Sequence, residues 1–212
     1  MSVKILAAPR RYVQGPGALA QLGSQLRVFG IQNPLILASP SALKACRETI
    51  EQSFNAAHVR FAFVEFGREC TFKEIKRVKE VCLEGNHDAI VSCGGGKAMD
   101  TGRAAAAGFA FNVGVSPPEA IERLGANVPC VQVPTVAASD AATASLSVIY
   151  NDHGEEETTV LIRVNPTMVL ADTTVIAQAP VRSLVAGMGD ALATYFEADV
   201  VHRAGVPAIT GG

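Results

Sequence analysis

Three consecutive glycines and a lysine, Gly94-Gly95-Gly96-Lys97, are the residues of this sequence best suited to hold a phosphate. They follow an apolar run at 88–93 that predicts a strand, and they open a stretch of small residues at 97–108 that predicts a helix. Glycines let the backbone approach a ligand closely, and the free N–H groups at a helix start attract an anion. The spacing is neither that of a P-loop nor that of a G-x-G-x-x-G turn. A tight turn without a ligand therefore stays open as the alternative.

A second polar segment, residues 134–140, follows the next predicted core strand at 131–133. Ligands of open α/β sheets bind beyond the carboxyl ends of the strands. We therefore expect Thr135 and Asp140 to face the same crevice as the glycines. Asp140 could equally serve as a plain helix cap.

Asp190 lies between glycines and apolar residues in the stretch 187–192, which predicts part of a helix. A carboxylate on an apolar helix needs a partner, and a divalent metal ion is one. A salt bridge or solvent is the alternative partner. The 4 histidines show no ligand spacing, so none of them is a metal-ligand candidate.

The elements that must position these residues alternate between short apolar runs and amphipathic stretches. This alternation predicts an α/β fold with a Rossmann-like, mainly parallel sheet covered by helices. Segments 145–150 and 158–163 flank the turn at 151–154 and predict a β-hairpin insert. Ser41 is predicted to cap the helix that follows the strand at 35–38, and residues 117–125 are predicted to form a short helix.

The pattern becomes helical from residue 181 and stays so to residue 202. We therefore expect a dinucleotide-binding α/β domain over residues 1–172. Residues 173–212 should form the beginning of an all-helical domain that is incomplete in this chain.

Composition excludes several classes of protein. The chain has 212 residues, a net charge of −2 and scattered lysines and arginines, so no nucleic-acid partner is expected. It has no apolar run of about 18 residues and no signal-peptide pattern, so we expect no membrane partner and a cytoplasmic location. The 5 cysteines lack a C-x-x-C spacing and should be free thiols.

Taken together, these segments resemble the iron- or zinc-dependent polyol dehydrogenase family, within which the glycerol-oxidising enzymes fit best. The matching stretches span nearly the whole chain in the family's order: 11–15, 94–101, 134–140, 146–150 and 187–198. The combination is specific, whereas any one stretch alone is not.

The resemblance implies roles for individual residues. Gly94, Gly95, Gly96, Lys97 and Ala98 match the stretch that cradles the cofactor pyrophosphate. Thr135, Leu146, Val148 and Tyr150 match positions on the nicotinamide side of the cofactor. Asp140 matches an acid near the polyol, and Asp190 matches the first ligand of a divalent metal, zinc or iron.

The reaction implied is hydride transfer from glycerol or a related small polyol to NAD, which gives dihydroxyacetone. Ser39 stands where the family often carries the ribose-binding acid, so NADP stays possible. The resemblance places the remaining metal ligands in the helical domain, so we expect this chain alone to be nearly inactive. An apolar surface left open on the helical part predicts a homo-oligomer.

Two other functions stay open. One is a relative of the glycerol-phosphate dehydrogenases or dehydroquinate synthases, which would need basic residues for a substrate phosphate. Arg163 and Arg182 are the candidates for that task. The other is a non-catalytic remnant that binds a nucleotide.

Overall fold

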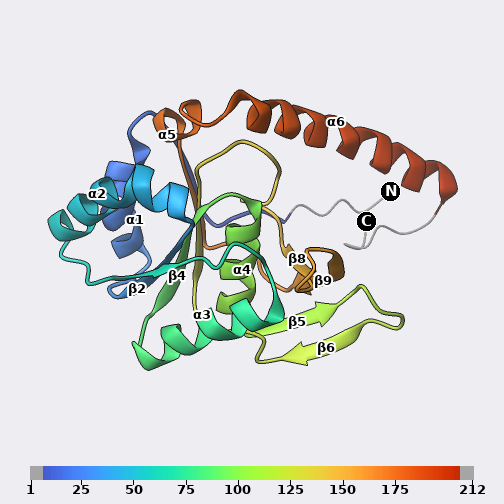
Figure 1. The fold of residues 1–212 in the computed structure, drawn as a ribbon, viewed down its shortest axis with the longest axis horizontal. Coiled ribbons are helices and arrows are strands. Elements are labelled where there is room, and N and C mark those ends of the chain that lie inside the picture. The colour runs from blue at the N-terminus through green and yellow to red at the C-terminus, as the bar shows by residue number, and fades with distance from the viewer. Residues whose placement is uncertain (1–6, 206–212) are drawn as a thin grey trace, which may run out of the picture.

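The computed structural model describes residues 7–205, which form a six-stranded parallel sheet, a four-stranded antiparallel sheet and the helices around them (Figure 1). This architecture confirms the predicted α/β fold with a mainly parallel sheet. Residues 1–6 and 206–212, which the expected domain ranges also include, lie outside the described residues.

The parallel sheet has the strand order β1-β10-β7-β4-β2-β3. Its strands are β1 (Tyr12–Gly15), β2 (Pro34–Ala38), β3 (Ala62–Glu65), β4 (Ala89–Gly94), β7 (Cys130–Pro134) and β10 (Met168–Asp172). Every residue of β2, β4 and β10 is buried. Their continuous apolar sequences are typical of strands that are covered on both faces.

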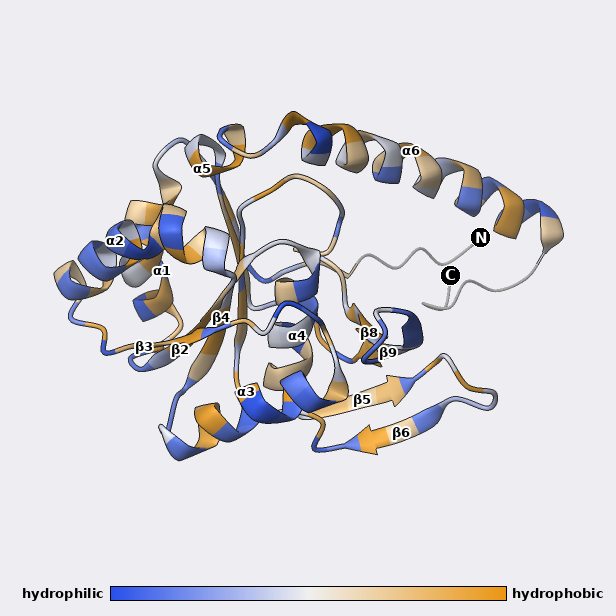
Figure 2. Cartoon of the chain, in the orientation of Figure 1, coloured by the Kyte–Doolittle hydropathy of each residue, from blue (hydrophilic) through white to orange (hydrophobic). Residues whose placement is uncertain are grey.

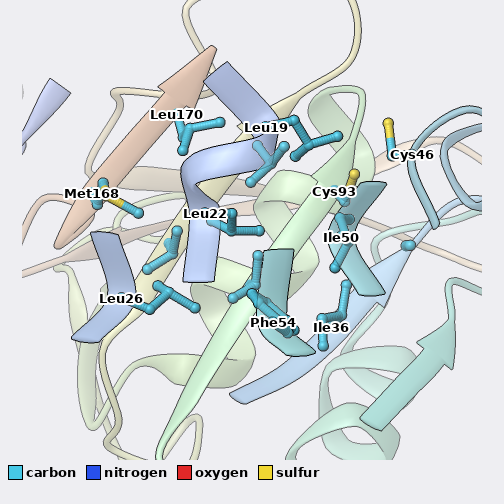
Figure 3. Close-up of a cluster of buried hydrophobic side chains, with 14 of the residues drawn as sticks. Leu19, Leu22, Leu26, Ile36, Cys46, Ile50, Phe54, Cys93, Met168 and Leu170 are labelled. Atoms are coloured by element: carbon cyan, nitrogen blue, oxygen red, sulfur yellow. The ribbon is translucent and has the colours of Figure 1, made fainter. Parts of the chain in front are cut away.

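The helices are η1 (Ala18–Gln21), α1 (Leu22–Val28), α2 (Pro40–Ala56), α3 (Phe72–Glu84), α4 (Gly96–Ala106), α5 (Thr173–Ala177) and α6 (Val181–Ala204). Helices α1 to α4 cover the two faces of the parallel sheet. Helices α1 and α2 pack on one face through Leu22, Leu26, Ile50 and Phe54, which contact strand residues such as Ile36 (Figure 3). Helices α3 and α4 belong to the cluster on the opposite face, with Leu35 and Leu37 of β2.

The antiparallel sheet has the order β6-β5-β9-β8. Its strands are β5 (Phe109–Asn112), β6 (Glu119–Glu122), β8 (Leu146–Tyr150) and β9 (Glu156–Ile162). The predicted hairpin is present as β8 and β9, which are paired along their length. Strands β5 and β6, which the sequence pattern did not indicate, extend the hairpin into a sheet.

Two local predictions are wrong. Residues 117–125 were expected to form a helix, but β6 lies there because it pairs with β5 and its Ile121 packs against the buried cluster. Tertiary pairing outweighs the helix-start signal of the two prolines. Ser39, not Ser41, caps α2, since its Oγ accepts a hydrogen bond from the N–H of Ala42.

Helix α6 confirms the predicted helical stretch and runs out beyond the two sheets (Figure 1). None of its residues is buried. No helix described over residues 7–205 is long and apolar enough to span a bilayer.

Candidate functional site

The glycine turn, Gly94–Gly96, lies at a topological switch point of the sheet, between strands β2 and β4. Strands β2 and β4 are parallel neighbours, but the helices that follow them, α2 and α4, pack on opposite faces of the sheet. The crevice beyond such a switch point is the usual ligand site of open α/β sheets. Ser39 after β2 and Gly94 at the end of β4 meet here, since a Cβ on Gly94 would lie 3.2 Å from Ser39 Oγ.

The start of α4 has no side-chain cap. Gly95 is its N-cap residue and offers no side chain to the first N–H groups of the helix. The N–H of Met99 donates to the Gly95 carbonyl (3.1 Å), so the N–H groups before it lie in the first turn, where helices lack internal partners. The crowding at Gly94, where a Cβ would also lie 3.1 Å from Ala98 Cβ, explains why glycine is needed for this close approach.

The polar segment after β7 lies against this turn, as the sequence predicts. The N–H of Thr135 donates to the Gly94 carbonyl at 3.0 Å. A Cβ on Gly96 would lie 3.6 Å from Ser139 Oγ, which is ordinary contact distance. The ends of two neighbouring parallel strands, β4 and β7, therefore bring the glycine turn and the hydroxyl-bearing segment side by side.

Lys97 makes two contacts that its position in the turn did not predict. Its Nζ lies 2.6 Å from Glu69 Oε2 and 4.5 Å from the centre of the Tyr150 ring. Burial raises the pKa of the Tyr150 hydroxyl, and the Lys97 charge opposes this shift. The structure thus unites two predicted cofactor residues with Glu69. Glu69 escaped the sequence analysis because it lies on the loop after β3, remote from both in the chain.

The predicted nicotinamide-side residues share one side of β8. Leu146, Val148 and Tyr150 are half-buried, whereas Ser147 and Ile149, which alternate with them, are fully buried. Alternate residues of a strand point to opposite faces. The side chains of Leu146, Val148 and Tyr150 therefore point to the same face of β8.

Asp140 and Asp190 are brought together although they lie on different elements. The N–H of Asp140 donates to Asp190 Oδ2 at 3.3 Å. Helix α6 comes close here because Gly187 has no side chain, since a Cβ on it would lie 2.2 Å from the Ala137 carbonyl oxygen. Asp140 also lines a cavity of about 390 Å³ beyond the ends of β1, β7 and β10.

Asp190 belongs to no group of three candidate metal ligands in the part of the chain that the structure describes. Among residues 7–205 no three His, Cys, Asp or Glu side chains gather as a metal site requires. The five cysteines are free thiols, as predicted. The described residues therefore do not fit a complete metal site.

The structure also shows the surroundings of Ser39 and of Arg163 and Arg182, the two candidates for binding a substrate phosphate. Ser39 follows β2, and its Oγ caps α2 and lies 3.3 Å from Ser41 Oγ. The Arg163 guanidinium lies 4.6 Å above the Phe109 ring on the antiparallel sheet. Arg182 is exposed on α6.

A buried ion pair behind the crevice was missed by sequence reasoning. Arg103 of α4 is 1% exposed, and its guanidinium lies 2.6 Å from Asp100 Oδ1. Burial raises the pKa of the Asp100 carboxyl, and the Arg103 charge and hydrogen bond oppose that shift. The spacing of three residues is a sequence signal for such a pair, but it does not reveal burial.

Comparison with known proteins identifies a matching family. The family model described as "Iron-containing alcohol dehydrogenase" matches residues 9–173. A glycerol dehydrogenase of Pseudomonas putida is 35% identical over 209 residues, which cover 99% of this chain and 52% of that protein. A glycerol dehydrogenase of Thermotoga maritima is 37% identical over 203 residues, which cover 96% of this chain and 50% of that protein.

A solved structure agrees with this match. The crystal structure of glycerol dehydrogenase from Schizosaccharomyces pombe superposes with a TM-score of 0.80 at 30% identity, covering 96% of this chain and 47% of that one. This chain therefore spans about half the length of the relatives that it matches.

Proposed function

The chain belongs to the iron-containing alcohol dehydrogenase family, and from this premise we propose that it supplies the dinucleotide-binding part of an NAD-dependent dehydrogenase for glycerol or a related small polyol. The single observation that carries the proposal is the glycine turn at the switch point of the sheet, with an uncapped helix start beside it. Relatives with the printed name glycerol dehydrogenase support the choice of substrate class.

The pyrophosphate of the cofactor would lie on Gly94, Gly95, Gly96, Lys97 and Ala98. Open N–H groups and the positive end of the α4 dipole favour an anion at this place. Lys97 would exchange its contact with Glu69 for the phosphate charge.

The nicotinamide half of the cofactor would lie along Thr135, Leu146, Val148 and Tyr150. Two of these residues lie close to the turn, since the N–H of Thr135 donates to Gly94 and the Tyr150 ring is 4.5 Å from Lys97 Nζ. When bound, NAD supplies the hydride acceptor. Asp140 would lie beside the polyol and orient it through a hydroxyl group, since its side chain is exposed at the crevice. Oxidation of the C2 hydroxyl of glycerol would transfer a hydride to NAD and release the hydroxyl proton to solvent, which would give dihydroxyacetone and NADH.

The neutral side chain of Ser39 bears on whether the chain binds NAD or NADP. A neutral hydroxyl does not repel a 2′-phosphate as a carboxylate does. We propose NAD as the cofactor, and dissociation constants for NAD and NADP measured side by side test this choice. A stronger affinity for NADP would contradict it.

Asp190 is proposed as the first ligand of a divalent metal, zinc or iron. Its exposed carboxylate next to Asp140 suits that position. The described residues do not supply the three protein ligands that catalytic zinc takes. We accordingly propose that the 212-residue chain has little activity alone. A glycerol-dependent turnover of about 1 per second or more would contradict this.

Calorimetric titration with NAD tests the dinucleotide site directly. We expect a dissociation constant below about 1 mM for the wild-type chain. Gly96→Val should weaken binding at least about tenfold, because branched side chains crowd the helix start and Ser139. Gly189→Val, at an exposed helical position of α6 where a Cβ would meet no atom within 4 Å, is the matched control and should bind NAD as the wild type does. Equal binding by Gly96→Val would contradict the assignment of the turn.

The exposed apolar side chains of α6 support self-association, and we propose a homo-oligomer. Sedimentation at several protein concentrations tests it, and a monomer throughout would contradict it.

A further inference from the structure

We propose that Arg103 is a positioning residue that holds residues 139–148 against helix α4, so that the nicotinamide half of the cofactor site keeps its place relative to the pyrophosphate turn. This inference rests on the proposed function. It assigns a task to a buried cation that is not among the proposed cofactor residues.

The guanidinium contacts both ends of an irregular segment. One nitrogen, Nη2, donates to the Ala141 carbonyl, and the other, Nη1, donates to the Leu146 carbonyl at the start of β8. The residues between these carbonyls belong to neither a helix nor a strand. A single side chain thus fixes the two ends of the segment that follows Asp140 and leads into β8.

Asp100, the ion-pair partner of Arg103, adds a second connection to the same strand. Its Oδ1 accepts from Arg103 Nη1 (2.6 Å), and its Oδ2 accepts from the N–H of Val148 (3.4 Å). Ser147 Oγ donates to the Asp100 carbonyl at 3.0 Å. The pair therefore connects α4 to three successive residues of β8, from Leu146 to Val148.

The geometry of the arginine side chain matters for this task. A guanidinium presents several N–H donors in a rigid plane, whereas a lysine ammonium is a single point charge on a flexible stem. Lysine at position 103 could keep the ion pair with Asp100, but it lacks the two separate terminal nitrogens that donate to the Ala141 and the Leu146 carbonyls. Arg103→Lys should therefore preserve the fold and loosen the segment.

The chain contains a matched control for this substitution. Arg77 and Glu74 on α3 form an ion pair with the same spacing and the same N–O distance of 2.6 Å. The Arg77 side chain is 43% exposed, against 1% for Arg103. Its remaining partner is the carbonyl of Glu65, at the end of β3.

The test compares the wild type, Arg103→Lys and Arg77→Lys in two measurements. Hydrogen exchange followed by mass spectrometry reports the protection of residues 141–148. Titrations with NADH and with ADP-ribose, which lacks the nicotinamide, report the two halves of the cofactor site. We expect Arg103→Lys to speed exchange in 141–148 several-fold and to weaken NADH binding about fivefold or more, while ADP-ribose binding stays within twofold.

A loss of structure in general would weaken both ligands, so the difference between NADH and ADP-ribose separates positioning from folding. Arg77→Lys should leave the exchange of 141–148 and both affinities unchanged. Wild-type affinity of Arg103→Lys for NADH, or equal losses for both ligands, would overturn this role and leave the proposed function standing. A wild-type chain that bound neither ligand would overturn the proposed function and this role with it.

Discussion

The two sheets with helices η1 and α1 to α5, here termed the α/β body, enclose two buried apolar clusters, whereas helix α6 has no buried residue. Phe54 of α2 is 0% exposed, but Phe196 of α6 is 58% exposed. Figure 2 shows hydrophobic residues distributed along α6, which lies away from the sheets. The α/β body is therefore stabilised by its own contacts, and α6 draws little stability from the described residues.

The two proposed halves of the site differ in the same way. The glycine turn joins a strand to a helix that are both packed in the α/β body. Asp190 lies on α6 and meets the α/β body at Asp140. The proposed dinucleotide site is therefore built from packed elements of the α/β body, whereas the proposed metal site at Asp190 lacks a complete set of ligands in the described residues.

The largest expected effect concerns the buried core. Phe54→Ala should lower the free energy of unfolding by about 3–5 kcal/mol, because it leaves a cavity in the cluster under α1 and α2. Phe196→Ala on α6 is the matched control and should change it by less than about 0.5 kcal/mol. Urea unfolding of both variants measures the difference. Similar losses for the two would remove the contrast between the α/β body and α6.

The second effect compares two aspartates. Asp172 is 4% exposed and accepts hydrogen bonds from the N–H groups of Gly17, Leu19 and Thr174. Asp172→Ala should cost about 2–3 kcal/mol at pH 7, since buried donors lose a charged acceptor. Asp190→Ala should cost almost nothing.

The cost of Asp172→Ala should also depend on pH. Burial raises the pKa of Asp172, but the backbone donors outweigh it and hold the pKa below its usual value. Its stabilisation is therefore present above the unfolded pKa of about 3.9 and is lost as the pH falls through the folded pKa. Urea unfolding at pH 7 and at about pH 3 checks this, and a difference between wild type and variant that failed to shrink in acid would count against it.

A smaller effect concerns the affinity of the glycine turn. Glu69→Gln should release Lys97 and raise NADH affinity about two- to fivefold, the range expected for an exposed ion pair. Glu51→Gln breaks the exposed pair with Arg47 on α2 and serves as the control. Fluorescence titration with NADH measures both variants. Weaker binding by Glu69→Gln would show that Glu69 supports the ligand rather than competing for Lys97.

Sequence reasoning succeeded where a signal lies within a few residues. The turn Gly94–Gly96 between a strand and a helix, and the hairpin turn at 151–154, have local signatures and were predicted. It failed at 117–125, where pairing with β5 outweighs a local helix signal. Arg103 and Glu69 were missed because their partners lie far away in the chain, and only the fold brings them together.

The central claim is that the α/β body alone supports the dinucleotide site. Fluorescence titration of Asp190→Ala with NADH, beside the wild type, tests it most directly. We expect both to bind NADH with dissociation constants that agree within about twofold, below about 1 mM. Loss of NADH binding in Asp190→Ala would contradict it, because the dinucleotide site would then depend on α6.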